Sequence, residues 1–153
     1  MKKSLGFLLL LLSVNSFADV ITMRSDLWCP YVCDPKSEKP GFIVEVAREI
    51  FKKEGHIIDY DLMNWARAVA DVREGKINAL VGCSKADAVG FVFPNVPIGI
   101  MVNHYYVLAD SKWDYKGVDS LTSKKIGVIN EYSYGHTVDE QIKKKNPALK
   151  LVS

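Results

Sequence analysis

Aromatic, basic and hydroxyl side chains follow three apolar segments of this chain, and these residue types suit the binding of a small solute. An aromatic ring covers much ligand surface while losing little entropy, and an arginine binds a carboxylate through two parallel hydrogen bonds. In a parallel α/β sheet the carboxyl ends of the strands hold small ligands, because neighbouring loops converge there. We therefore predict a binding edge whose main segment runs from Asp59 to Pro94. Its candidate contacts are Trp28, Tyr31, Trp65, Arg67, Ser84 and Lys85.

Each of these side chains also has a structural interpretation. One of Trp28 and Tyr31 can pack into its own loop. Arg67 can form a surface ion pair at the start of a helix, although a cation there opposes the helix dipole and therefore favours a binding role. Ser84 is a better candidate than Lys85, because a lysine in a loop is usually solvated.

A second group of candidates lies in the last third of the chain. Ser133, Tyr134 and Gly135 precede a predicted helix, so their free backbone N–H groups could receive an anionic group. The alternative is ordinary capping, since Thr137 and Glu140 have the spacing of a capping box. We keep all three residues as candidate contacts.

The cysteines allow two interpretations. Cys29 and Cys33 are the close pair, which leaves Cys83 unpaired, although spacing alone does not exclude a bond from Cys83 to either of them. The pair encloses Pro30 and Tyr31, as in thiol oxidoreductases, but it is separated by three residues rather than two. A structural disulfide is the preferred interpretation, and a periplasmic thiol-disulfide protein is the alternative.

Metal and acid/base chemistry have little support in the sequence. The three histidines are scattered without metal-ligand spacing, so we predict no metal and no cofactor. Near the predicted strand ends we find no paired carboxylates, and Asp87 is the only acidic candidate. We therefore predict a protein that is not an enzyme.

Hydrophobic periodicity predicts the elements that position these residues. A helix is expected where Ile43, Val46, Ala47, Ile50 and Phe51 form one apolar stripe, closed by Gly55. A second, narrower stripe of Ala66, Val69 and Ala70 ends at Gly75. Strands are predicted at Val20–Arg24, His56–Leu62 and Asn78–Gly82. This alternation predicts a parallel sheet with right-handed crossovers.

The pattern then loosens before a second α/β region. An extended run is expected at Tyr105–Ala109, and the polar segment Asp110–Ser123 reads as a boundary. Strands are predicted at Lys125–Ile129 and Leu149–Val152, with a helix from the Thr137 capping box to about Asn146-Pro147 between them.

The first eighteen residues are typical of a secretory signal peptide. Lys2 and Lys3 precede an apolar core, and Ser16 and Ala18 supply the small residues of a cleavage site after Ala18. The core is too short for a membrane span, which needs about 20 apolar residues. We predict an exported, periplasmic protein. Without this segment, acidic and basic residues are equal in number, so nothing indicates a nucleic-acid partner.

The ordered motifs resemble those of the periplasmic solute-binding proteins of the polar amino-acid family (family 3 type), which serve ABC importers. The resemblance covers most of the chain after the signal peptide. It rests on Trp28 with Tyr31, Pro40-Gly41-Phe42, Trp65-Ala66-Arg67, Gly82-Cys83-Ser84, Phe91-Val92-Phe93-Pro94, and Lys125-Ile126-Gly127-Val128 leading to Tyr132-Ser133-Tyr134-Gly135.

The resemblance implies an α/β fold of the type II periplasmic-binding-protein kind, with two lobes around a cleft. Residues 19–109 would form the first lobe and residues 110–153 the start of the second. The implied function is capture of a small polar solute, an amino acid or related carboxylate, for an ABC permease in the inner membrane. The same fold also occurs in periplasmic dehydratases of the cyclohexadienyl type, which are the enzymatic alternative. A sensing domain of a signalling protein is a further one.

Two departures from the family pattern bear on function. An arginine typically clamps the ligand carboxylate after the third strand, whereas this chain has Lys85 followed by Asp87. A different small polar or anionic solute is therefore as compatible with the sequence as an amino acid. The family also continues through the second lobe and returns to the first, so we expect a C-terminally truncated member with impaired stability and weak or absent affinity.

Overall fold

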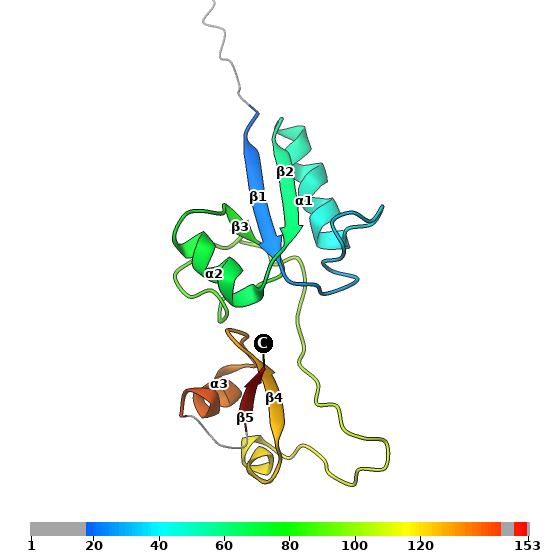
Figure 1. Ribbon diagram of the computed structural model, residues 1–153, viewed down its shortest axis with the longest axis vertical. Coiled ribbons are helices and arrows are strands. Elements are labelled where there is room, and N and C mark those ends of the chain that lie inside the picture. The colour runs from blue at the N-terminus through cyan, green and yellow to red at the C-terminus, as the bar shows by residue number, and fades with distance from the viewer. Residues whose placement is uncertain (1–17, 145–148, 153) are drawn as a thin grey trace, which may run out of the picture.

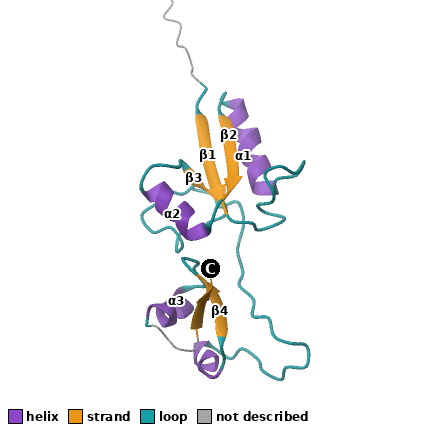
Figure 2. Cartoon of the chain, viewed as in Figure 1, coloured by secondary structure: helices purple, strands orange, loops and turns teal. Residues whose placement is uncertain are grey.

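Two α/β units make up the part of the chain that the structure describes, residues 18–144 and 149–152 of a computed structural model (Figure 1). The predicted signal peptide lies almost wholly outside these residues. Within them, no helix has the length and apolarity to cross a membrane. The first unit contains β1 (Val20–Ser25), α1 (Phe42–Lys53), β2 (Ile57–Leu62), α2 (Trp65–Arg73) and β3 (Ala79–Leu80). The second contains the 3₁₀ helix η1 (Val118–Ser123), β4 (Ile126–Ile129), α3 (His136–Lys143) and β5 (Leu149–Val152) (Figure 2).

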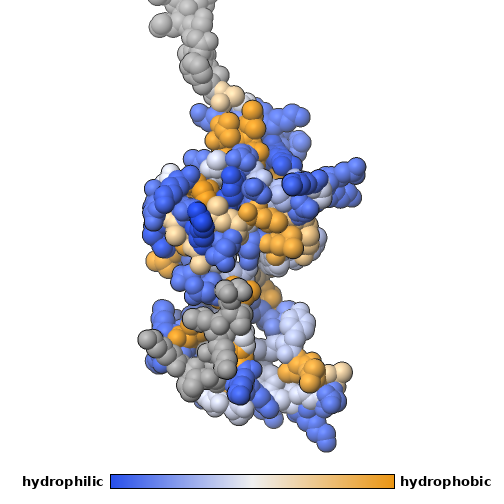
Figure 3. Space-filling view, in the orientation of Figure 1, coloured by the Kyte–Doolittle hydropathy of each residue, from blue (hydrophilic) through white to orange (hydrophobic). Residues whose placement is uncertain are grey.

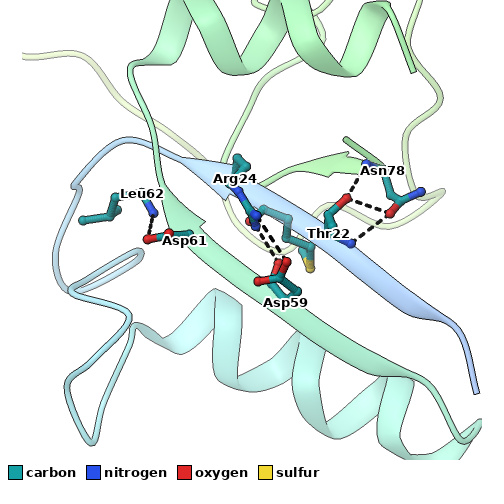
Figure 4. Close-up of polar contacts among 7 residues, drawn as sticks. Thr22, Arg24, Asp59, Asp61, Leu62 and Asn78 are labelled. Atoms are coloured by element: carbon teal, nitrogen blue, oxygen red, sulfur yellow. Dashed lines mark hydrogen bonds and ion pairs between the residues drawn. The ribbon is translucent and has the colours of Figure 1, made fainter. Parts of the chain in front are cut away.

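The sheet of the first unit is parallel, which confirms the prediction from the alternating elements. Its strand order is β2-β1-β3, and β1 pairs with β2 along its whole length, from Val20 opposite Ile57 to Ser25 opposite Leu62. The chain thus adds β2 on one side of β1 and β3 on the other, while α1 and α2 lie on opposite faces of the sheet (Figure 4). Such a reversal of strand order opens a crevice at the carboxyl ends of the central strands.

Helix α1 covers one face of the sheet, but its buried side differs from the predicted stripe. Val44 is fully buried beside Met23, Ile58 and Val81, and Ile43, Ala47 and Phe51 pack against this core. The prediction was wrong for Val46 and Ile50, which are 40% and 55% exposed. Because successive residues of a helix are 100° apart, Val46 and Ile50 lie at the margin of the apolar stripe. The stripe is wider than the part of α1 that β1 and β2 cover.

Polar side chains hold the strands together on the opposite face (Figure 4). Arg24 donates from Nη1 to the carbonyl of Asp59 at 2.7 Å and pairs its Nη2 with the Asp59 carboxylate at 3.2 Å. Thr22 donates from its backbone N and its Oγ1 to Oδ1 of Asn78, at 2.9 and 2.7 Å. These bonds hold Asn78 just before β3, which is shorter than the predicted strand Asn78–Gly82 at both ends.

The second unit confirms the two predicted strands and corrects the predicted helix start. β4 and β5 pair in parallel, with Ile126 opposite Leu149. Helix α3 begins at His136, and its N-cap is Gly135, which makes no side-chain capping bond, so Thr137 does not cap it. Asp139 reaches back instead and accepts hydrogen bonds from the Ser133 hydroxyl and the Tyr134 backbone, at 2.7 and 2.8 Å. The predicted end near Asn146-Pro147 lies outside the described residues.

Residues 81–117 join the two units without forming a helix or strand (Figures 1 and 2). The predicted extended run Tyr105–Ala109 therefore pairs with no other strand in the described chain. Tyr105 stacks on Tyr115 with ring centroids 4.3 Å apart, which folds the segment back on itself. Hydrophobic surface is visible on both units (Figure 3) and includes the amino ends of β1 and β2, where Val20 and Ile57 are exposed.

Candidate functional site

A cavity of about 300 Å³ lies where the carboxyl ends of β1 and β3 meet the loop that follows β4. This is the crevice that the reversed strand order predicts. Residues of both units line it, together with part of the joining segment. The lining side chains that the argument uses are Asp26, Trp28, Trp65, Asp87, Tyr132, Ser133 and Tyr134.

The end of β1 supplies the first carboxylate. Ser25 is buried and donates from Oγ to the carbonyl of Val81 at 3.0 Å, which ties the end of β1 to the end of β3. Asp26 follows immediately and lines the cavity. Its Oδ2 accepts a hydrogen bond from the hydroxyl of Tyr132 in the second unit. Burial and this bond raise the pKa of Tyr132, so the hydroxyl keeps its proton and remains a donor.

The loop after β3 supplies the second carboxylate. Ser84 donates to Oδ2 of Asp87 from its backbone N at 2.8 Å and from its hydroxyl at 2.5 Å. Oδ1 of the same carboxylate accepts the backbone N–H of Ser133 at 2.6 Å. Ser84 therefore positions Asp87 rather than lining the cavity, and Asp87 links the loop to the second unit.

Trp28 forms one aromatic wall. A β-bridge between Trp28 and Val32 and a disulfide between Cys29 and Cys33, whose Cα atoms are 4.9 Å apart, close the turn that carries it. The ring of Tyr31 packs against Trp28 at 4.5 Å and lies outside the cavity lining. Of the two aromatic candidates, Trp28 thus faces the cavity, while Tyr31 supports it.

Gly82 makes room for the Trp28 ring. Its φ of +77° is in the left-handed region, and a β-carbon at this position would lie 3.4 Å from two ring carbons of Trp28. The left-handed backbone is what favours glycine here, two residues after β3, and the Trp28 ring lies in van der Waals range of this position.

Trp65 forms the second wall and reaches across to the other unit. Asn64 caps α2 by accepting from the backbone N of Arg67 at 3.2 Å, which sets the helix start and places Trp65 at its first position. Nε1 of Trp65 donates to the carbonyl of Glu131 at 3.0 Å. Its ring meets that of Tyr132 edge to face at 5.7 Å.

The remaining predicted contacts lie in different places. Ser133 and Tyr134 line the cavity, whereas Gly135 is the N-cap of α3 and does not. Arg67 pairs with Asp71 at 3.5 Å and its side chain is 74% exposed, which matches the surface ion pair considered above. Lys85 lines a separate shallow hollow beside Phe91 and Phe93.

Sequence reasoning missed several lining residues. The expectation that no second carboxylate stands near the strand ends was wrong, because Asp26 and Asp87 both line the cavity. The position of Asp26 directly after a predicted strand was the available signal. Tyr132 and the stretch 101–104 also line the cavity, and no periodic pattern marked that stretch.

The charges of the lining are one-sided. Its carboxylates are Asp26 and Asp87, no lysine or arginine belongs to it, and its one basic side chain is His104. The described residues contain no group of three side chains that could hold a metal ion.

The thiol of Cys83 lies next to Gly82, near this site. Burial, followed by the nearby charge of Asp87, raises its pKa to about 11. A thiol in this state is a poor nucleophile at neutral pH.

Comparisons with protein-family models, with curated proteins and with solved structures found no significant match to this chain. The function is therefore inferred from the cavity and from the order of the sequence motifs.

Proposed function

We propose that this chain is an extracytoplasmic solute-binding protein that captures a small polar solute between its two units and presents it to an ABC permease of the inner membrane. The observation that carries the proposal is the shared cavity: its walls come from the ends of β1 and β3 in one unit and from the loop after β4 in the other. A volume of about 300 Å³ suits one small molecule.

Reversible contacts join the two walls. Trp65 donates to the Glu131 carbonyl, Tyr132 to Asp26, and the Ser133 backbone to Asp87. Each neutral hydrogen bond contributes about 0.5–1.5 kcal/mol, and a bond to a charged group roughly 1.5–3 kcal/mol. These contacts are weak enough for the two walls to separate. A solute that touches both walls adds its own contacts only when the walls are closed.

Closure of this kind converts binding into a signal for a partner. A ligand shifts an equilibrium between open and closed forms only by its differential affinity for the two. The joining segment, residues 81–117, lies outside helices and strands. We propose that it serves as the hinge. In the proposed mechanism the permease recognises the solute-stabilised closed form.

Binding is better supported than acid/base catalysis at the same cavity. Asp26 and Asp87 both accept hydrogen bonds from neutral groups of the protein itself, which suits carboxylates that hold the walls together. The Cys29–Cys33 disulfide likewise closes the turn that carries Trp28, which supports a structural role over a redox one. We propose that export follows cleavage after Ala18, which mass spectrometry of the mature N-terminus would test.

Thermal-shift screening of the purified chain against amino acids, small carboxylates, small amines and sugars tests the binding proposal. A true ligand at 100 times its Kd stabilises the folded state by about 2.7 kcal/mol. The shift should persist in Arg67→Ala, whose side chain lies outside the cavity, and should shrink in Trp28→Leu, which removes an aromatic wall. Absence of any shift across the panel would contradict the proposal.

A further inference from the structure

Two negative charges at the cavity lack a basic partner. Within the residues that the structure describes, neither Asp26 nor Asp87 takes part in an ion pair. Their hydrogen-bond donors are a phenol, a serine hydroxyl and backbone N–H groups, all of which are neutral.

The nearby basic side chains are engaged elsewhere. Arg24 pairs with Asp59 on the sheet, Arg67 pairs with Asp71 along α2, and Lys85 lines the separate hollow. The cavity therefore carries two carboxylates that no lysine or arginine of its own lining offsets, and His104 is the one basic side chain in that lining.

The aromatic walls strengthen the same preference. Trp28, Trp65, Tyr132 and Tyr134 line the cavity, and the faces of such rings attract cations. The ring centroid of Tyr132 lies 5.7 Å from that of Trp65 and 6.2 Å from that of Tyr134, so these three rings form one cluster. A cationic nitrogen placed here would lie beside aromatic rings and carboxylates together.

An anionic solute would meet the opposite situation. It would have to leave water for a site that holds two carboxylates and no lysine or arginine, where like charges repel and no guanidinium fork is present. The lining thus discriminates against anions as well as favouring cations.

We propose that the solute captured at this cavity carries a positively charged nitrogen, an amine or a quaternary ammonium, rather than a carboxylate as its main recognition group. The inference rests on the proposed solute-binding function and narrows it. Asp26 is the principal counter-charge, because Asp87 also holds the loop after β3 and the Ser133 backbone.

Isothermal titration calorimetry with matched probes tests the charge preference directly. Putrescine, 1,4-butanediol and succinate have similar lengths but different charges, and choline has the neutral isostere 3,3-dimethylbutan-1-ol. We expect a cation of at least one set to bind about tenfold more tightly than its neutral isostere, the scale of a desolvated cation–π contact with a carboxylate nearby. Succinate should not bind.

A charge-removing variant and a matched control complete the test. Asp26→Asn keeps the shape of the side chain and an acceptor for the Tyr132 hydroxyl. It should reduce the affinity of the cation to within about threefold of the affinity of its neutral isostere. Asp110→Asn makes the same change at an exposed position outside the cavity and should keep the tenfold preference. Tighter binding of succinate or 1,4-butanediol would overturn the cation proposal while upholding solute binding. Failure of every probe in this panel and in the broader screen would overturn both.

Discussion

The carboxylate of Asp87 accepts the backbone N–H of Ser133 at 2.6 Å, across 46 residues of sequence. The same side chain also receives two hydrogen bonds from Ser84, so one acidic residue organises the loop after β3 and attaches it to the second unit. Because of this link, the stability of the loop after β3 depends on contact between the two units.

We predict that Asp87→Ala lowers the free energy of unfolding by roughly 1–3 kcal/mol, the range for removing a charged acceptor from partly buried donors. Urea denaturation followed by circular dichroism measures it. Lys85→Ala, two residues away in the shallow hollow, is the control and should stay within about 0.5 kcal/mol of the unchanged chain. Equal losses in both variants would show that Asp87 makes no special contribution.

Gly82→Ala should bring a methyl group into van der Waals contact with the Trp28 ring. The substitution places a β-carbon 3.4 Å from the Trp28 ring and strains a backbone with φ +77°, at a cost of about 1 kcal/mol or more. Gly90→Ala is a matched control, because Gly90 has φ +88° but open space around it. Both variants should lose stability, whereas only Gly82→Ala should change tryptophan emission and near-ultraviolet circular dichroism. Identical spectra for the two variants would contradict the contact.

Removal of the disulfide should destabilise the chain and loosen Trp28. For a loop as short as Cys29–Cys33 the chain-entropy argument gives roughly 2 kcal/mol, which a melt of Cys29→Ser/Cys33→Ser would measure. Thiol–disulfide exchange with glutathione tests the redox alternative. A structural bond should resist mild reductant, and rapid cycling without loss of stability would favour an oxidoreductase.

Cys83 should react slowly with iodoacetamide. Its pKa of about 11 exceeds that of an ordinary thiol, so at pH 8 roughly a hundredfold less of it is thiolate. The raised pKa also means that the neutral thiol favours the folded state. That contribution is fully present below about pH 9 and is lost as the pH rises through about 11. Alkylation rates in native and urea-unfolded protein check the shift, and equal rates would refute it.

Local patterns carried most of the fold prediction. The parallel pairing of β1 with β2 and the positions of β4 and β5 follow from apolar runs and turn residues that are close in sequence. Capping of α3 was predicted less well, because its N-cap is Gly135 without a side-chain bond, and Asp139 instead accepts hydrogen bonds from Ser133 and Tyr134 in the loop before the helix.

The site was harder to predict because its contacts are distant in sequence. Asp26 and Tyr132 are 106 residues apart, and no local pattern joins them. Arg67 is a different case, since Asp71 stands four residues later on the same helix and the spacing alone favours their ion pair. Trp28, Trp65, Ser133 and Tyr134 were nevertheless identified as candidates, because each follows or flanks a strand end.

The joining segment 81–117 has a thermodynamic consequence for the two walls. Within the described residues it tethers them in one molecule, so the meeting of Tyr132 with Asp26 is an intramolecular event. A tether sets an effective concentration of one wall at the other that falls as the linker lengthens but does not depend on how dilute the protein is. The closed fraction should therefore not change when the protein is diluted, whereas two separate half-sites would part as concentration falls.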